Sequence, residues 1–272
     1  MNAIKKIIIY LLLIAIALFM TFPFFWLAST SLKGQTETIF PSPPRWIPEA
    51  PTLENYKIVL EHVDMARSTL NTAIITIMGV FLNVLLAAMA AYPLARINFI
   101  GKKMIFALLM GTLMIPMQGT MIINYVTLKA LGLLDTFLGL VLPTAVNVIA
   151  IVILKTSYEA VPDEIEEAAR VDGCGEFRLW LQVMVPIIKP TLAAVCILGF
   201  VYYWNDFMWP LIVISSSEKW PLQMALSKLS SAVQTNYRYI TAGAVMSMLP
   251  ILLFFAFTQR YFIEGTKGAV KG

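Results

Sequence analysis

The sequence predicts an all-α, polytopic membrane protein, and its composition, its apolar runs and the placement of its basic residues support that expectation. Of the 272 residues, 59% are hydrophobic and only 13% are charged, and the mean hydropathy is +0.77. A single soluble domain of this size cannot cover so much apolar surface. Two cysteines are too few for a secreted disulfide scaffold. The net charge of +4 comes from scattered basic residues, unlike the clustered patch of a typical nucleic-acid binder.

The first predicted span runs from Ile7 to Leu27 and contains no charged residue. Lys5 and Lys6 precede it, and an aromatic belt at 24–26 closes it, as is usual at a membrane interface. The run is longer than the roughly 7–15 apolar residues of a cleavable signal peptide, which is the alternative interpretation. We therefore expect an uncleaved span.

Five further apolar runs are long enough to cross a bilayer, for which about 20 residues are needed. The five runs are Ala73–Ala95, Met104–Ile123, Phe137–Leu154, Thr191–Ile214 and Ile240–Phe262, and each contains at most one charged residue. Together with the first run they predict six transmembrane helices. Proline interrupts each of these five runs, at Pro93, Pro116, Pro143, Pro210 and Pro250. The carbonyls that proline leaves free must be satisfied by neighbouring helices or by a wet cavity.

The basic residues predict that both termini are cytoplasmic. With the N-terminus inside, the inner segments hold twelve of the 20 basic residues and the outer segments hold eight. An excess of Lys and Arg marks the cytoplasmic side. We thus expect residues 1–68 to form the first span and a proline-rich external loop, 69–262 a five-helix core with a cytoplasmic loop at 156–190, and 263–272 a cytoplasmic tail.

The two long connections differ in their local signals. The outer one, Ser31–Ser68, carries five prolines, which favour extended geometry over helix. The inner loop instead predicts a short helix at Pro162–Asp172. Proline suits its first position, acidic residues suit its N-terminal end, and Gly173 suits a left-handed cap.

The predicted inner helix has a narrow apolar stripe of Ile165, Ala168 and Ala169, whose small side chains permit close approach of a partner. An amphipathic helix lying on the lipid surface is the alternative, but its acidic residues would be repelled by anionic lipid. A second helical stretch should follow, with four apolar side chains on one face, namely Phe177, Trp180, Leu181 and Met184.

These residues resemble a known family. The run Glu167-Ala168-Ala169, followed by Asp172-Gly173, Val183 and Pro186, resembles the EAA loop in the membrane subunits of ABC importers. The stretches Tyr203–Leu211 and Pro44–Pro48 are similar to the MalG-like permeases of the carbohydrate-uptake group. The resemblance covers nearly the whole chain. Cys174 stands where the family usually has alanine, another small residue.

The resemblance implies a type I ABC importer permease fold and a permease subunit for an oligosaccharide or sugar derivative in a bacterial or archaeal cytoplasmic membrane. It implies as partners a second homologous permease, two P-loop ATPase subunits and an extracytoplasmic solute-binding protein. The chain has no P-loop motif, so ATP and Mg are expected on the ATPase partner and no cofactor on this chain. The residues expected to couple to the ATPase are Glu167, Ala168, Ala169, Asp172, Gly173 and Pro186.

Polar residues within the spans are candidates for the substrate pathway. Asp206 is the strongest, because a charge within a span is costly and usually functional. It should share a helical face with Tyr202 and Trp209, which suits a sugar ring. An aromatic belt with a carboxylate that caps a broken helix is the alternative. Neutral candidates, which equally suit interhelical hydrogen bonds, are Asn83, Gln118, Asn124, Asn147 and Asn205.

The sequence gives little support for an enzymatic function. The single histidine, His62, falls in the predicted external loop, so we expect neither a histidine-based triad nor a metal site. A secondary transporter or uniporter for a polar solute, which needs no ATPase, is the alternative function. A membrane scaffold without transport activity is a third.

Overall fold

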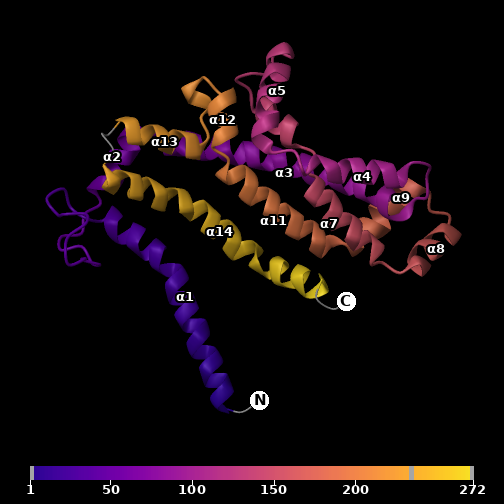
Figure 1. Cartoon of the computed structure of the whole chain (residues 1–272), viewed down its shortest axis with the longest axis horizontal. Helices are drawn as coiled ribbons and strands as arrows, with labels where there is room; N and C mark the ends of the chain where they lie inside the picture. Colours follow the sequence, from indigo (N-terminus) through magenta and orange to yellow (C-terminus); the bar gives the residue numbers. More distant parts are fainter. Residues whose placement is uncertain (1–2, 233–235, 270–272) are drawn as a thin grey trace. The chain divides into compact units, whose positions relative to one another are not determined.

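The structure is a computed structural model that describes residues 3–232 and 236–269. Its regular elements within these residues are all helical. The chain divides into two compact units, the first comprising residues 1–66 and 222–252 and the second comprising residues 67–221 and 253–272. Figure 1 labels the helices along the chain.

The first unit contains α1 (Ala3–Ser31), α2 (Glu54–His62), α13 (Leu222–Ala232) and the beginning of α14 (Tyr237–Ala269). Its interior includes a close approach of α14 to α13, where a Cβ on Gly243 would lie 2.7 Å from Cδ2 of Leu226. The apolar window of α1 is 0% buried within the described chain, so this helix must find its apolar surroundings in lipid or another protein.

The proline-rich segment after α1 is held by buried polar groups. Nζ of Lys33 donates hydrogen bonds to the carbonyls of Ile39 and Arg45, at 3.1 and 3.2 Å, and its side chain is fully buried. Nδ2 of Asn55 donates to the carbonyls of Ser31 and Lys33, at 2.8 and 2.9 Å. The expectation that Ser31–Ser68 is extended throughout was wrong at its second half. There α2 forms and α3 begins at Met65, because 54–62 contains no proline.

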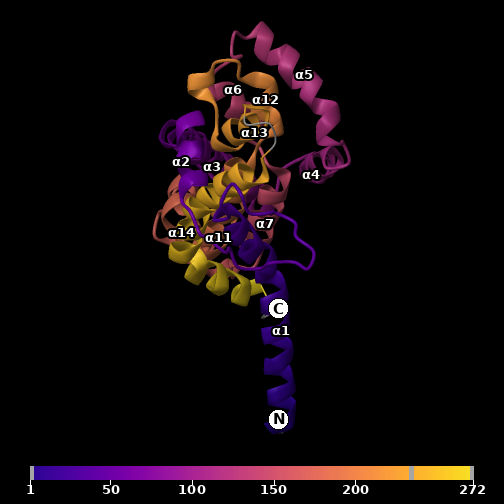
Figure 2. The ribbon, with the colours of Figure 1, turned by 90° about the vertical axis from the view of Figure 1, so that its left-hand side faces the viewer.

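The second unit is built around α3 (Met65–Arg96), which crosses it as one long helix. The other elements of the unit follow in chain order: α4 (Lys102–Thr112), α5 (Met117–Ala130), α6 (Phe137–Val141), η1 (Leu142–Thr144), α7 (Val148–Glu159), α8 (Asp163–Val171), α9 (Glu176–Leu179), the π-helical η2 (Trp180–Met184), α10 (Val185–Ile187), α11 (Lys189–Asn205), α12 (Met208–Val213) and η3 (Ser217–Lys219). In Figure 2 the short helices α6 and α12 lie together, with α5 beside them.

Small residues let α3 approach its neighbours closely. Ala87, Ala88 and Ala91 of α3 are buried in a core that also contains Leu154 and Tyr158 of α7. A buried leucine side chain such as that of Leu154 contributes about 1.5–3 kcal/mol by leaving water, whereas each alanine methyl contributes only about 0.8 kcal/mol. In a membrane, close packing of small residues is the larger part of helix association.

Length and composition of the described helices do not confirm all six predicted spans one by one. Three helices, at Ile4–Ser31, Met65–Arg96 and Tyr237–Gln259, are long and apolar enough to cross a membrane, and two bent pairs raise the number to at most five within the described residues. The pairs are Phe137–Thr144 with Val148–Glu159, bent by 52°, and Glu176–Ile187 with Lys189–Asn205, bent by 79°.

Three predicted spans are broken, and the first is Phe137–Leu154, which divides between η1 and α7. The run Met104–Ile123 splits into α4 and α5 around Pro116, which has no N–H to donate and disfavours helix at Ile115 before it. The run Thr191–Ile214 is interrupted where α11 ends at Asn205, and α12 then starts at Met208. Proline lies inside intact helices at Pro93 and Pro250, so its presence alone does not locate a break.

Candidate functional site

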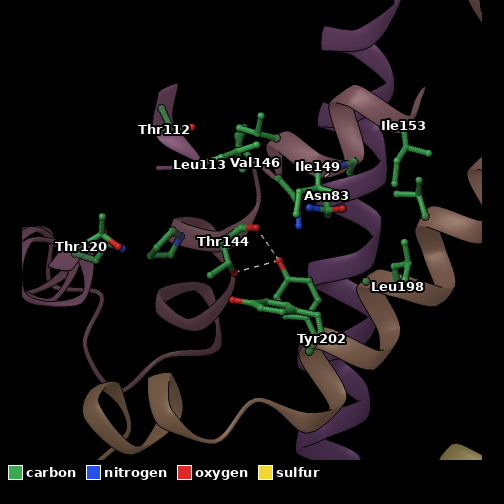
Figure 3. A pocket seen from close by; sticks show the side chains of 18 residues that line it. Asn83, Thr112, Leu113, Thr120, Thr144, Val146, Ile149, Ile153, Leu198 and Tyr202 are labelled. Atoms are coloured by element: carbon green, nitrogen blue, oxygen red, sulfur yellow. Dashed lines mark hydrogen bonds between the residues drawn. The ribbon is translucent and has the colours of Figure 1, made fainter. Parts of the chain in front are cut away.

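A cavity of about 500 Å³ lies in the second unit, between α3, α11 and the segment that joins α6 to α7 (Figure 3). The ends of α4 and α5 complete its wall. None of the described residues that line it is Asp, Glu, Lys, Arg or His. Eight of the lining residues carry a neutral amide or hydroxyl group: Asn83, Thr112, Thr120, Asn124, Thr144, Asn147, Tyr202 and Tyr203.

The break between α6 and α7 positions two of these amides. Pro143 lies in the short η1 turn, after which the chain must restart a helix. Oδ1 of Asn147 accepts a hydrogen bond from the N–H of Ala150 at 3.1 Å and so caps α7. Nδ2 of Asn83, on α3, donates to the carbonyl of Ala145 at 3.4 Å. Both asparagines therefore hold the break together while they line the cavity.

Tyr203 joins α11 to the same break. Its hydroxyl donates to the carbonyl of Thr144 and accepts from Oγ1 of Thr144, each at 3.1 Å, as the dashed lines in Figure 3 show. Its ring packs on Gly79 so closely that a Cβ there would lie 2.4 Å from Cζ of the ring. Sequence reasoning missed Tyr203 and Thr144. The available signal was a glycine in the middle of an apolar helix, which often marks close contact with a neighbouring group.

Of the predicted pathway residues, Asn83, Asn147 and Tyr202 lie together at this cavity. Asn124, another amide named from the sequence, also lines it. Gln118 is exposed and lies outside the described lining. Asn205 is exposed as well, and its Nδ2 donates back to the carbonyl of Val201 at 2.8 Å.

The expected common face of Tyr202, Asp206 and Trp209 was wrong, because the helix does not continue through these residues. Asp206 has extended backbone, with φ −66° and ψ 126°, where α11 ends. Its Oδ1 accepts from the N–H of Trp209 at 3.4 Å and so caps the start of α12. Trp209 is buried, and its Nε1 donates to the carbonyl of Gly139 at 3.3 Å. This is the capping arrangement that the sequence left as the alternative.

The inner loop contains the predicted short helix, with small differences. α8 begins at Asp163 and ends at Val171, so Pro162 is its N-cap and not its first residue. Gly173 has φ +82°, a left-handed conformation that favours glycine, as predicted. The N–H of Cys174 reaches back to the carbonyl of Ala169 at 3.0 Å, which completes the C-terminal cap.

The predicted apolar stripe of α8 is only partly uncovered in the chain itself. Glu166 and Ala169 are buried in the chain itself, whereas Ile165 is 37% exposed and Ala168 is exposed. The reason is electrostatic, since a buried arginine, Arg96, lies opposite Glu166. Glu167 and Asp172 are also exposed, so α8 presents a mixed acidic and small-residue surface that the chain itself leaves uncovered.

The stretch after α8 also differs from a simple amphipathic helix. Trp180 and Met184 are buried, but Phe177 and Leu181 are 68% and 47% exposed, so the predicted single face was half wrong. The wider π-turn at Trp180–Met184 rotates the side chains relative to an α-helix. Nε1 of Trp180 donates to the hydroxyl of Tyr158 at 3.0 Å, and Pro186 is exposed in α10.

A second polar cluster, which sequence reasoning missed, joins the α5–α6 loop to the segment after α12. Asp135, a non-glycine residue with φ +56°, accepts hydrogen bonds from the amides of Ser215 and Ser216 and from Nζ of Lys219. The bonds from Ser216, and then from Lys219, hold the pKa of Asp135 well below its ordinary value. Among the described residues, no group of three His, Cys, Asp or Glu side chains could hold a metal ion.

Comparison with known proteins identifies the class. Residues 83–267 match the family model described as the inner membrane component of binding-protein-dependent transport systems. An arabinooligosaccharides transport system permease protein of Bacillus subtilis is 31% identical over 99% of this chain and 97% of the relative. The melibiose/raffinose/stachyose import permease of the same species is 32% identical over 92% of this chain and 91% of the relative.

A solved structure agrees with these relatives. A chain of a bacterial ABC transporter involved in the import of the acidic polysaccharide alginate has a TM-score of 0.80 and 26% identity, and the match covers 95% of this chain and 96% of that one. The fold and the cavity thus belong to a membrane-embedded transporter subunit. The chain belongs to the family of inner membrane components of binding-protein-dependent transport systems, as a permease subunit of an ABC importer.

Proposed function

We propose that this permease forms half of a translocation pathway for a carbohydrate, either an oligosaccharide or a sugar derivative. The observation that carries the proposal is the neutral polar cavity. Amides and hydroxyls such as Asn83, Asn124 and Tyr202 are suited to exchange hydrogen bonds with sugar hydroxyls, which both donate and accept. The relatives named for arabinooligosaccharides and for melibiose, raffinose and stachyose support the same substrate class.

The proposed assembly contains a second homologous permease, two P-loop ATPase subunits and an extracytoplasmic solute-binding protein. ATP and Mg would bind to the ATPase subunits, and this chain would bind no cofactor. Both termini would be cytoplasmic, in a bacterial or archaeal inner membrane. The loaded binding protein would favour the outward-open state, whereas closure of the ATPase subunits on ATP would favour the opposite state. The binding protein and ATP would thus shift the same conformational equilibrium.

The proposed coupling surface is the exposed side of α8. Glu167 and Ala168 are uncovered and adjacent, and Asp172 and Gly173 end the helix beside them. A groove on the ATPase that accepts a small residue next to a carboxylate would fit this surface. Pro186 would serve indirectly, by fixing the chain direction where α10 leads into α11. Ala169 would contribute through internal packing, because it is buried.

Affinity purification tests the assembly. The tagged chain, extracted from its native membrane in mild detergent, is expected to copurify with a second permease and a P-loop ATPase, as identified by mass spectrometry. The genetically associated binding protein is then screened against neutral and acidic oligosaccharides by calorimetry. Recovery only as a homo-oligomer, without an ATPase in several detergents, would instead favour a secondary transporter.

A further inference from the structure

Arg96, the last residue of α3, is the most deeply buried cationic contact of the inner loop. Its side chain is 8% exposed. Its guanidinium donates hydrogen bonds to the carbonyl of Val161 and to Oδ1 of Asp163, and its Nε lies 3.0 Å from Oε1 of Glu166 as an ion pair. Asp163 is 81% exposed, so its contact is screened by water, whereas Glu166 is only 6% exposed.

These three contacts fix the start of α8. Val161 lies just before the helix, Asp163 is its first residue and Glu166 lies one turn further on. A planar guanidinium donates in two fixed directions to Val161 and Asp163 while its charge stays beside the carboxylate of Glu166, a combination that a lysine ammonium does not reproduce. α8 is therefore held by its N-terminal turn against the end of α3.

The pair is also part of a closed ring of polar contacts. Glu166 lies 3.3 Å from Nη2 of Arg170, and Nε of Arg170 lies 3.0 Å from Oε1 of Glu176. Glu176 in turn accepts from the hydroxyl of Tyr92 at 3.3 Å. Tyr92 lies one helical turn before Arg96, so both ends of the ring return to α3.

The same helix reaches the cavity. Asn83, which lines it, precedes Arg96 by 13 residues on α3, a distance of roughly 20 Å along the helix axis. A long helix with two anchored ends transmits displacement better than a loop, since its backbone hydrogen bonds hold its length. The ion pair thus lies where a movement of α8 becomes a movement of a cavity wall.

We propose that Arg96 is a positioning residue for transport, which locks α8 to α3 through Glu166 so that displacement of α8 reaches the cavity. This inference rests on the proposed function, because it assigns α8 the role of receiving force from the ATPase. Arg96 itself contacts neither substrate nor nucleotide. Its loss should leave ATP hydrolysis running while the cavity no longer follows it.

The test uses the complete transporter in proteoliposomes, with the binding protein and its sugar, and measures sugar imported per ATP hydrolysed. In Arg96→Gln the ratio is expected to fall about tenfold, with assembly and basal ATP hydrolysis retained, as for other losses of coupling between distant sites. Arg96→Lys should restore part of the lost ratio of sugar imported to ATP hydrolysed. The matched control is Arg178→Gln, because Arg178 of α9 is an exposed arginine whose Nε donates to Oε1 of Gln182 at 2.8 Å.

A ratio in Arg96→Gln equal to that of the wild type would overturn the inference. If Arg96→Gln does not assemble, Glu166→Gln decides, since it keeps the side chain's size and removes only its charge. A similar fall in that variant supports the inference and an unchanged ratio overturns it. If both variants fail to assemble while Arg178→Gln assembles normally, the inference is also overturned, because the Arg96–Glu166 pair would then be needed only for folding or assembly. A wild-type complex that imports nothing with ATP would contradict the proposed function instead.

Discussion

At the scale of single residues, the cavity separates asparagines that line it from one that does not. Asn83 is buried and lines the cavity, whereas Asn205, on α11, is exposed and bonds to its own helix. A buried amide that bonds to a sugar hydroxyl cannot be replaced by an apolar group without loss of binding, because the hydroxyl is then left unpaired. The two residues thus provide a matched pair for testing the pathway.

We expect Asn83→Leu to raise the apparent KM for sugar about five- to tenfold, the effect of losing about 1–1.4 kcal/mol from one neutral hydrogen bond. Initial uptake rates in proteoliposomes at varied concentrations of loaded binding protein measure it. Asn205→Ala is the control and should leave KM unchanged. Thermal denaturation of the purified complex separates a loss of binding from a loss of folding, since Asn83 also bonds to Ala145. Equal KM values in the two variants would remove Asn83 from the pathway.

Asp206 carries a different expectation, because it caps α12 and is not among the described residues that line the cavity. Asp206→Asn keeps a capping oxygen and should leave KM within about twofold. Asp206→Ala removes the cap and should cost about 1 kcal/mol of stability, measured as a lower denaturation temperature. A large rise of KM in Asp206→Asn, at unchanged stability, would return this carboxylate to the substrate pathway.

Gly79 is a position where one methyl group decides the packing of two helices. A Cβ there would lie 2.4 Å from the ring of Tyr203, which is held by two hydrogen bonds to Thr144. We expect Gly79→Ala to destabilise the protein by about 1–3 kcal/mol, as overpacking does in tight interiors. The control is Gly111→Ala, where nothing lies within 4 Å of the new Cβ. Chemical denaturation in detergent micelles compares them, and equal stabilities would contradict the close contact.

At the scale of elements, local chemistry predicted the inner helix well and the spans less well. Proline at 162, the acidic first turn and Gly173 specify α8 through neighbours in sequence, and α8 forms within one residue of its predicted start and end. The buried face of α8 could not be predicted, because it depends on Arg96, which is 70 residues before Glu166 in the sequence. The sequence shows Glu166 only as one of the acidic residues near the N-terminal end of the helix.

The positions of the breaks within the predicted spans also depend on contacts between segments that are distant in sequence, and not on proline alone. Proline lies inside the intact α3 at Pro93 and beside the break between α4 and α5 at Pro116. The two runs have similar hydropathy and one proline each. Whether the helix breaks therefore depends on whether the carbonyl that proline leaves free finds a hydrogen-bond partner. The cavity residues Asn83 and Asn147 were predictable as polar groups within spans. Their convergence on one break required the structure.

The cluster at Asp135 links the α5–α6 loop to the segment after α12, and its ionisation should hold at every physiological pH. The pKa of Asp135 is lowered in the folded protein, so the stabilisation is present above the unfolded value of about 4 and is lost as pH falls through the lower folded value. Hydrogen exchange at the Ser215 and Ser216 amides, corrected for intrinsic rates, should show constant protection from pH 5 to pH 8. Asp135→Asn should lower that protection, and a protection that titrates near neutrality would contradict the assignment.

At the scale of the whole molecule, the chain combines a neutral polar cavity with an exposed acidic helix on separate parts of one compact unit. In the proposed function, the cavity would be the route for a polyhydroxyl solute, and the helix would be the surface for a partner that supplies energy. The chain has no P-loop of its own. Neither the cavity nor α8 is sufficient alone. Transport by this mechanism requires that force on α8 changes the shape of the cavity.

Substitutions on the exposed side of α8 should separate hydrolysis from transport. We expect Glu167→Lys, which reverses an exposed charge, and Gly173→Pro, which forbids φ +82°, to reduce sugar uptake at least about tenfold while the protein stays in the membrane. Membrane abundance by immunoblot and uptake of labelled sugar by cells measure both effects. Glu164→Lys, another exposed acidic residue of α8, is the control for added charge. Normal uptake in both variants would contradict the coupling role.

The most direct test of the account is sugar uptake by the purified permease pair, ATPase and loaded binding protein in sealed proteoliposomes, with and without ATP. The account predicts accumulation of the sugar above its external concentration, only with hydrolysable ATP and only with the binding protein. Accumulation driven by an ion gradient in the absence of ATP, or equilibration without accumulation in its presence, would contradict it.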